Sequence, residues 1–537
     1  MKKKHLPLFL LLCLTLGGCA SSPVQSASSS VSTESAFSTA ESASSSLSSE
    51  TSESSSESTA ETISISEESS LTSWSESISE SSSQSSTAAD GTYHFYCIND
   101  FHGCIVEQYS DKGYEPGIAK LFGYLKEQKN KDPEHTIILS AGDMYQGSVE
   151  SNSNFGSLVT EAMNDAGFDA MAIGNHEFDY GQQYIPQFAE LADFPILGGN
   201  VMKYDNGPTD ELWNPDVLAP STILERGGNK IGIVGMIGAG QTSSITSEFV
   251  KDITFPEPSK LALAEAEKLR KEGCSLVIYV LHDTYRNCVD YAADKAYFDG
   301  VFTGHTHSLE KKFVNGVPFL QSYSNGTALS HFVITLKDGA STCTTYENIS
   351  ASKYWDEDES IAAIRDSYIL DPDFVAHTSA YCGHINGTLQ KKTGVPALGA
   401  EAIYHAYQED VECAMTNEGR STLSGDVYYR DIYKAMPFTN AIVIAKVRGA
   451  DIIHEMEYNP CYAPGIDTFD PEGWYIIAII DYLLFHQNTS KKYDYFTSLN
   501  EGEGGEVISR SQHYPFDIVS EYIRVNLEGY VNAADYN

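Results

Sequence analysis

From Thr92 onward, short apolar segments rich in Val, Ile, Phe and Tyr alternate with longer segments that have the pattern of helices. We expect buried strands at residues 93–98, 136–139, 170–173, 230–236, 275–281 and 300–303. We expect helices between them, among others at residues 117–131, 158–166 and 259–271. This alternation predicts an α/β fold whose sheets are buried under helices.

Side chains that can bind metals follow five of these six strands. They are Asp100 and His102, then Asp143, Asn175, His282, and finally His305 and His307. Loops at the carboxyl ends of strands converge on one crevice in an α/β fold. A lone His or Asp in a loop is usually structural, but this set at successive strand ends predicts a metal centre. Imidazole, carboxylate and amide ligands suit Mn, Zn, Fe or Co, and seven ligands indicate two divalent ions that share a carboxylate and act on a phosphoryl group.

The order of these motifs resembles the calcineurin-like metallophosphoesterases. The motifs are Asp-x-His at 100–102, Gly-Asp at 142–143, Gly-Asn-His-Glu at 174–177, His282, and Gly-His-x-His at 304–307. Asn-Asp-Phe-His-Gly at 99–103 is similar to the 5′-nucleotidase branch, which includes bacterial UDP-sugar hydrolases and 2′,3′-cyclic phosphodiesterases. The resemblance implies an αββα sandwich at 91–350, a linker helix region at 351–385, and an α/β substrate-recognition domain at 386–537.

The resemblance also implies roles for single residues. One ion would be held by Asp100, His102, Asp143 and His307. The other would be held by Asp143, Asn175, His282 and His305, so that Asp143 bridges the two. His176, positioned by Asp179, would be the catalytic dyad that stabilises the transition state or the leaving group.

The second half of the chain resembles the family's substrate-recognition domain. Pro-Phe-Thr-Asn at 437–440 is similar to the family's Pro-Phe-Gly-Asn motif, which implies that Phe438 stacks on a nucleobase beside Asn440. Tyr482 lies where the family has its second stacking aromatic residue, and an ordinary core position is the alternative. Asn417 and Arg420 belong to a shortened form of the family's arginine loop, so Arg420 replaces the usual arginine only if the loop rearranges.

The N-terminus has the pattern of an export signal. A basic start is followed by an apolar run at 6–16 that is too short to span a bilayer permanently. Leu-Gly-Gly-Cys at 16–19 resembles a bacterial lipobox, in which Cys19 would carry the lipid. The alternative is an ordinary secretory signal at 1–19. Residues 20–90 are rich in Ser and Glu and cannot bury enough apolar surface to fold, so we expect a disordered tether.

Charge and cysteine content restrict the function further. A formal net charge of −40 opposes binding of a nucleic-acid polymer as the main activity. Eight cysteines follow residue 19, and none forms a Cys-x-x-Cys pair, so a structural zinc site is not expected. Eight thiols allow 105 disulfide connectivities, and the sequence does not choose among them.

These features predict a phosphohydrolase for nucleotides, tethered by lipid at the extracellular face of a bacterial membrane, or secreted. Its partners would be a small nucleotide substrate and the membrane, while the oligomeric state stays open. The alternative is a surface lipoprotein that binds nucleotides or another ligand and whose esterase half is vestigial. The complete set of metal ligands argues against that alternative, because a drifting site loses ligands first.

Overall fold

The computed structural model describes residues 88–110, 112–485, 496–500, 502–511 and 513–537. The predicted export signal, the lipid site Cys19 and nearly all of the tether lie outside the described residues. Within the part of the chain that is described, no helix is long and apolar enough to span a membrane.

The first half of the chain contains two mixed sheets. The larger has seven strands in the order β18-β17-β1-β4-β5-β6-β9, and a parallel central part is extended by two antiparallel strands at one edge. Its strands are β1 (Gly91–Ile98), β4 (Thr136–Ser140), β5 (Ala170–Ala172), β6 (Ile196–Leu197), β9 (Leu218–Ala219), β17 (Ala328–Lys337) and β18 (Ala340–Ser350). The first three predicted strands are therefore neighbours in one sheet.

The second sheet has six strands in the order β10-β11-β13-β14-β16-β15. Its four inner strands are parallel and the two edge strands are antiparallel. The strands are β10 (Ser221–Arg226), β11 (Asn229–Ile237), β13 (Cys274–His282), β14 (Gly300–Thr303), β15 (Glu310–Val314) and β16 (Val317–Gln321). The remaining three predicted strands are neighbours here, as their apolar sequences require.

The two sheets pack face to face through a buried apolar layer. Phe95 and Phe332 of the first sheet meet Phe302 of the second, and the Phe302 and Phe332 rings stack at 4.4 Å between centroids. Gly300 makes this approach possible, because a methyl group at that position would collide with the Phe332 ring. The absence of a side chain at Gly300 therefore allows the sheets to pack closely.

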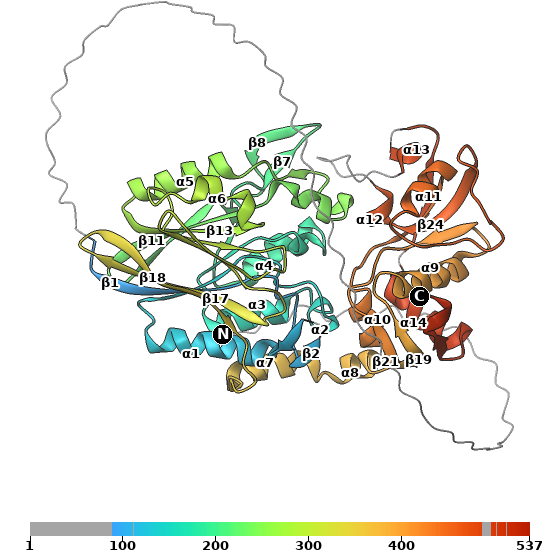
Figure 1. The fold of residues 1–537 in the computed structure, drawn as a ribbon, viewed down its shortest axis with the longest axis horizontal. Coiled ribbons are helices and arrows are strands. Elements are labelled where there is room, and N and C mark those ends of the chain that lie inside the picture. The colour runs from blue at the N-terminus through green and yellow to red at the C-terminus, as the bar shows by residue number, and fades with distance from the viewer. Residues whose placement is uncertain (1–87, 111, 486–495, 501, 512) are drawn as a thin grey trace, which may run out of the picture. The chain divides into compact units, whose positions relative to one another are not determined.

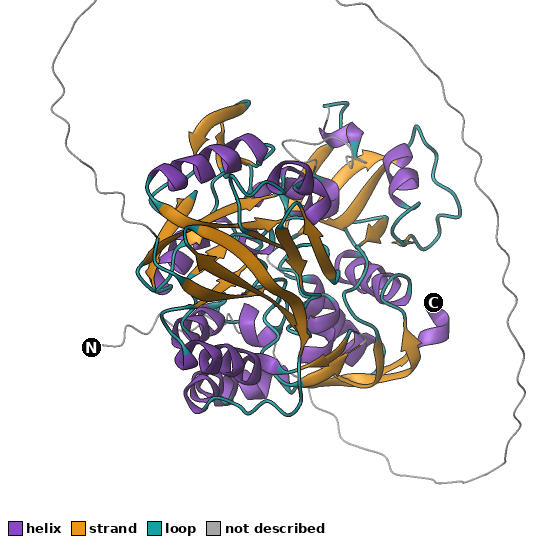
Figure 2. Cartoon of the chain, turned by 60° about the vertical axis from the view of Figure 1, so that its left-hand side comes forward, coloured by secondary structure: helices purple, strands orange, loops and turns teal. Residues whose placement is uncertain are grey.

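Helices cover the outer faces of both sheets. The helices α1 (Gly117–Lys131) and α3 (Ser157–Ala166) pack against the first sheet, and α5 (Ser259–Lys271) packs against the second. In Figure 1, α5 lies on one side of β11 and β13, while α1 lies on the far side of β1 and β17. Figure 2 shows the same strands with helices on both outer sides. The αββα sandwich that the sequence predicts is therefore present.

Two short helices follow the sandwich, within the linker helix region expected at 351–385. The helix α7 (Glu359–Ile369) begins after Asp358, whose carboxylate accepts hydrogen bonds from the first-turn amides of Ser360 and Ile361. The chain turns at Asp371, which caps a second helix, α8 (Pro372–Thr378), in the same way. Ile361 is buried against the first domain, as the amphipathic pattern requires.

The C-terminal part is a second α/β unit with its own core. Its five-stranded sheet has the order β23-β20-β24-β22-β25, and a three-stranded sheet has the order β21-β19-β26. The strands are β19 (Tyr381–Leu389), β20 (Cys413–Met415), β21 (Leu423–Tyr428), β22 (Ile442–Arg448), β23 (Cys461–Tyr462), β24 (Trp474–Ile480), β25 (Glu506–Arg510) and β26 (Tyr530–Asn532). The helices α9 (Gly394–Tyr407), α10 (Tyr429–Ala435) and α14 (Pro515–Glu521) contribute apolar residues to the core between these sheets.

Candidate metal centre

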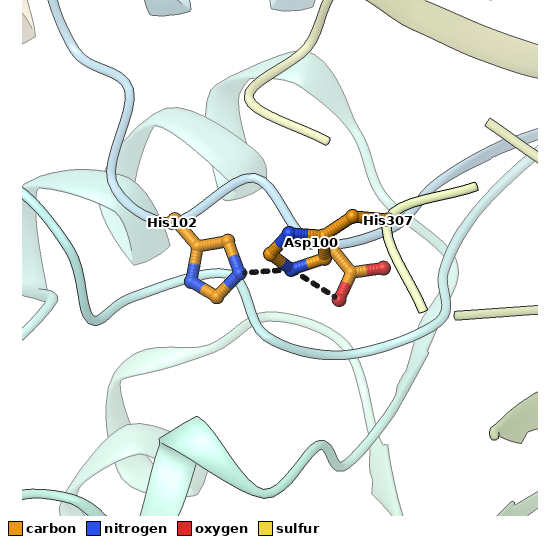
Figure 3. Close-up of side chains that lie close together, drawn as sticks. All are labelled: Asp100, His102 and His307. Atoms are coloured by element: carbon orange, nitrogen blue, oxygen red, sulfur yellow. Dashed lines mark hydrogen bonds and ion pairs between the residues drawn. The ribbon is translucent and has the colours of Figure 1, made fainter. Parts of the chain in front are cut away.

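The first cluster of potential ligands joins the loops that follow β1 and β14. Asp100 and His102 come from the first loop and His307 from the second (Figure 3). The Nε2 atoms of His102 and His307 are 2.9 Å apart, and His307 Nε2 is 3.4 Å from Asp100 Oδ1. One donor atom from each residue converges on a space that an ion could occupy.

The second cluster joins the loops after β4, β5, β13 and β14. It contains Asp143, His282 and His305. Asn175 completes it, because its Oδ1 lies 3.0 Å from both His282 Nε2 and His305 Nδ1. His282 Nε2 is 3.1 Å from Asp143 Oδ2. The structure thus gathers all seven predicted ligands into two adjoining groups.

The donor set fits a divalent cation. Among the described residues, Asp143 Oδ2 is buried and accepts no hydrogen bond of regular geometry, although His282 Nε2 lies 3.1 Å away. A buried carboxylate oxygen without a partner costs free energy that a cation would recover. Burial, followed by the His307 and His176 rings, holds the pKa of His102 well below its usual value. Burial and then His282 lower the pKa of His305 to about 4, so these imidazoles are neutral and can bind a metal.

Backbone carbonyls orient two of the imidazoles. His102 Nδ1 donates to the carbonyl of Gln146 at 3.0 Å, and His282 Nδ1 donates to the carbonyl of Ala141 at 2.7 Å. Each bond leaves Nε2 directed into a cluster, which is how metal-binding histidines are commonly fixed.

Left-handed backbone conformations are concentrated at the site. Five predicted ligands have positive φ, namely Asp100 (52°), His102 (51°), Asp143 (57°), His305 (71°) and His307 (49°). Such conformations are uncommon for residues other than glycine and cost free energy that the surrounding structure must offset. They turn the chain sharply after β1, β4 and β14, so that neighbouring side chains point into one space.

Glu177 is a buried residue whose role the sequence analysis missed. Its carboxylate accepts hydrogen bonds from the backbone amides of Asp143, Met144 and Gly174, each at 2.8 Å, and a longer one from Tyr145 at 3.4 Å. Burial and the nearby Asp143 raise the pKa of Glu177 to about 7. Glu177 thereby joins the loops after β4 and β5. The sequence feature that could have identified Glu177 as a site residue was its place in the Gly-Asn-His-Glu motif.

His176 and Asp179 form a close pair beside the second cluster. His176 Nδ1 donates to Asp179 Oδ2 at 2.6 Å, and the His176 amide donates to Asp143 Oδ1 at 2.8 Å. Burial alone would lower the pKa of His176, but Asp179 and then Asp143 outweigh it and the pKa is raised. The pair can therefore hold a proton and present it through His176 Nε2.

Two of the predicted substrate residues lie close to this pair. The Phe438 ring is stacked against His176 at 6.0 Å between centroids and 24° between planes. The Arg420 guanidinium lies 4.9 Å from the centre of the Phe438 ring. The shortened loop therefore still places Arg420 near the pair, although its binding of substrate stays a prediction.

The other predicted substrate residues are placed differently. Asn440 Nδ2 donates to Thr246 Oγ1 at 3.0 Å and to Asp481 Oδ1 at 3.1 Å, which ties three segments together. The Tyr482 hydroxyl donates to the Ser243 carbonyl at 3.4 Å, and its ring packs on the C-terminal core. Asn417 is half-buried directly after β20. The base-binding roles predicted for these residues remain predictions.

A small cavity lies between the dyad and the segment that carries Phe438. Its volume is about 20 Å³, and its lining includes Asp179, Phe438 and Asn440. The Pro437 carbonyl beside it accepts hydrogen bonds from Gln146 Nε2 at 3.0 Å and Asn152 Nδ2 at 3.1 Å. This volume admits a water molecule but not a nucleobase. A nucleobase could enter this cavity only if the segment at 437–440 moved.

Replacement of Asp143 tests the metal centre. We expect Asp143→Asn to bind fewer than two equivalents of Mn²⁺ while its circular dichroism spectrum stays that of the parent, because the amide lacks the charge that a cation requires. Metal content after gel filtration measures this. The control is Asp290→Asn, which removes an exposed carboxylate outside the site. Two tightly bound equivalents in Asp143→Asn would contradict the assignment.

Comparison with known proteins finds a matching domain family for each half of the chain. Residues 93–309 match the calcineurin-like phosphoesterase family. Residues 375–514 match the 5′-nucleotidase C-terminal domain. The two matches cover the two α/β units described above.

Individual relatives agree with this division. The chain is 25% identical over 410 residues to the protein named Endonuclease YhcR of Bacillus subtilis, a match that covers 68% of this chain and 33% of that protein. It is 25% identical over 426 residues to a 5′-nucleotidase of Vibrio cholerae, covering 68% of this chain and 75% of that one. The chain thus spans about a third of the length of one of these relatives and three quarters of the other.

Solved structures share the fold. A 5′-nucleotidase precursor from Thermus thermophilus superimposes with a TM-score of 0.67 at 16% identity, over 82% of this chain and 97% of that one. At this identity the likeness establishes the architecture alone. The two domain matches show that the chain combines a domain of the calcineurin-like phosphoesterases, a family of metal-dependent phosphoric ester hydrolases, with the C-terminal domain of the 5′-nucleotidases.

Proposed function

We propose that this protein is a phosphohydrolase of extracellular nucleotides that is exported and held to the membrane by a lipid on Cys19. Its substrates would be nucleoside monophosphates, with diphosphates, UDP-sugars or 2′,3′-cyclic nucleotides as further candidates. The observation that carries the proposal is the pair of adjoining ligand clusters next to a His–Asp pair whose histidine is stacked against Phe438.

Different residues would act on the phosphoryl group, the leaving oxygen and the base of such a substrate. Two divalent ions held by the clusters would neutralise charge on the phosphoryl oxygens and activate water. His176 Nε2 would donate a proton to the leaving oxygen, while Asp179 holds the ring and favours its charged form. Phe438 offers a face for a nucleobase, and Arg420 adds positive charge at the same place.

The acidic surface disfavours a polymer as the substrate. One relative is named an endonuclease, but a net charge of −40 repels a polymer with many phosphates. A mononucleotide meets only the local field of the site, where the metal ions and Arg420 are positive. The proposal therefore assigns small nucleotides rather than DNA or RNA.

A substrate panel tests this assignment. We expect the Mn²⁺-loaded protein to release phosphate from 5′-AMP with a kcat/KM well above that for a small aryl phosphate, because a nucleobase offers more surface for stacking on Phe438. UDP-glucose, 2′,3′-cyclic AMP and single-stranded DNA complete the panel. Tight binding of nucleotides without turnover of any compound would instead support a surface binding protein with a vestigial esterase half.

Replacement of the dyad histidine separates chemistry from metal binding. We expect His176→Ala to keep two bound metals and to lose roughly 10²–10⁴ in kcat, the usual range for removing a positioned proton-transfer group. The matched control is His384→Ala, because His384 also pairs with a carboxylate, Asp426 at 2.7 Å, but lies in β19 away from the site. Loss of one metal equivalent in His176→Ala would show that His176 is a ligand.

The anchor is tested by removing its attachment point. We expect Cys19→Ala to move the protein from the membrane fraction to the soluble fraction, because stable anchoring takes at least two acyl chains or a second signal. Immunoblots of fractionated cells measure the distribution. A variant that stays with the membranes would contradict the lipid assignment.

A further inference from the structure

Cys413 and Cys461 lie on neighbouring strands of the C-terminal sheet, diagonally across from each other. They belong to β20 and β23, which pair antiparallel with Met415 opposite Cys461 and Ala414 opposite Tyr462. Because side chains alternate along a strand, Cys413 lies on the same face as Met415, and therefore on the same face as Cys461. Both cysteines contact the same apolar cluster. Cys461 is also the largest cause of the raised pKa of the Cys413 thiol, so the two thiols interact.

This pairing distinguishes them from the other cysteines of the described chain. Five of the other six thiols donate to a protein oxygen instead. These are Cys97, Cys104, Cys288, Cys343 and Cys382. A disulfide bond needs two cysteines whose Cα atoms lie within about 7 Å and whose side chains point the same way, which neighbouring residues on one face of a strand pair can provide.

The two thiols differ in access. Cys413 is buried, and its interaction with Cys461, followed by burial, raises the pKa of its thiol. Cys461 is half-buried and lines a groove of about 360 Å³ together with Ala397, Ala400 and Tyr462. A small disulfide compound can therefore reach Cys461 first.

We propose that Cys413 and Cys461 form a disulfide bond when the protein meets an external disulfide compound. The Cys461 thiolate attacks one sulfur of that compound, and the other sulfur leaves as a thiolate. The Cys413 thiol then loses its proton and attacks Cys461 Sγ, which expels the second thiolate. The two protein thiols are oxidised, and one external disulfide is reduced to two thiols. Export to an oxidising compartment would favour the bonded form.

The bond would link the two ends of the segment 413–461, which contains the residues near the His176–Asp179 pair. The segment between the two cysteines contains both Arg420 and Phe438, and β20 leads directly into the loop of Arg420. Cross-linking a long segment removes freedom from the unfolded chain and stabilises the folded domain. The bond would thus stabilise the substrate-recognition domain. The metal ligands lie outside the segment that the bond closes.

Peptide mapping decides whether the bond forms. The purified full chain is reduced, freed of reductant and exposed to bis(2-hydroxyethyl) disulfide, an uncharged probe chosen because Glu401 and Asp535 line the groove. Alkylation and proteolysis without reductant should yield one peptide pair linked through Cys413 and Cys461, lighter than the separate peptides by two hydrogen atoms. Recovery of both cysteines alkylated, or of a stable mixed disulfide at Cys461, would overturn the proposal.

Thermal unfolding decides whether the bond stabilises the domain. We expect the oxidised parent protein to unfold roughly 5–10 °C higher than its reduced form. Cys413→Ser and Cys461→Ser should show no response to the probe. The control Cys343→Ser should keep the full response, because this half-buried thiol donates instead to the carbonyl of Thr345 at 3.2 Å. A response of equal size in Cys461→Ser would overturn the role of this pair.

Discussion

The carboxylate of Glu177 holds the metal centre together. It is fully buried and accepts backbone hydrogen bonds from the loops after β4 and β5. Hydrogen bonds to a charged acceptor contribute about 1.5–3 kcal/mol each. The loop after β4 carries Asp143 in a left-handed conformation, and the loop after β5 carries Asn175 and His176. Without this carboxylate the two loops would keep fewer direct links, such as the bond from the His176 amide to Asp143 Oδ1, and the orientation of the ligands would depend more on the metal.

Most of the catalytic domain could be predicted from the sequence. Each expected strand is present, and α1 and α5 have the predicted bounds. The prediction succeeded because apolar segments with β-branched residues must be buried, and because parallel strands deliver their following loops to one edge of a sheet. The linker helix is present as α7, but the pattern of apolar residues does not reveal that Asp371 starts a second helix after it.

For the predicted substrate-recognition residues, the sequence patterns identify the residues but not what surrounds them. The motif at 437–440 marks Phe438 and Asn440, but their surroundings depend on segments far away in the chain. Phe438 lies against His176 of the catalytic domain, and Asn440 bonds to Thr246 of the same domain. The contact between Cys413 and Cys461 is hidden in the same way, because strand register is decided by tertiary packing. Such contacts between distant segments cannot be read from local composition.

The left-handed backbone at five predicted ligands has a consequence for engineering. A glycine at such a position relieves the strain, so selection for heat resistance alone would favour replacing ligands by glycine. His307, which is half-exposed and has φ of 49°, is the position where such a replacement meets the least opposition from packing. A stabilising screen that does not also demand turnover would therefore remove the very residues that define this family. The left-handed conformation at these ligands lowers stability but places the side chains for activity. Thermostability and activity must therefore be selected together.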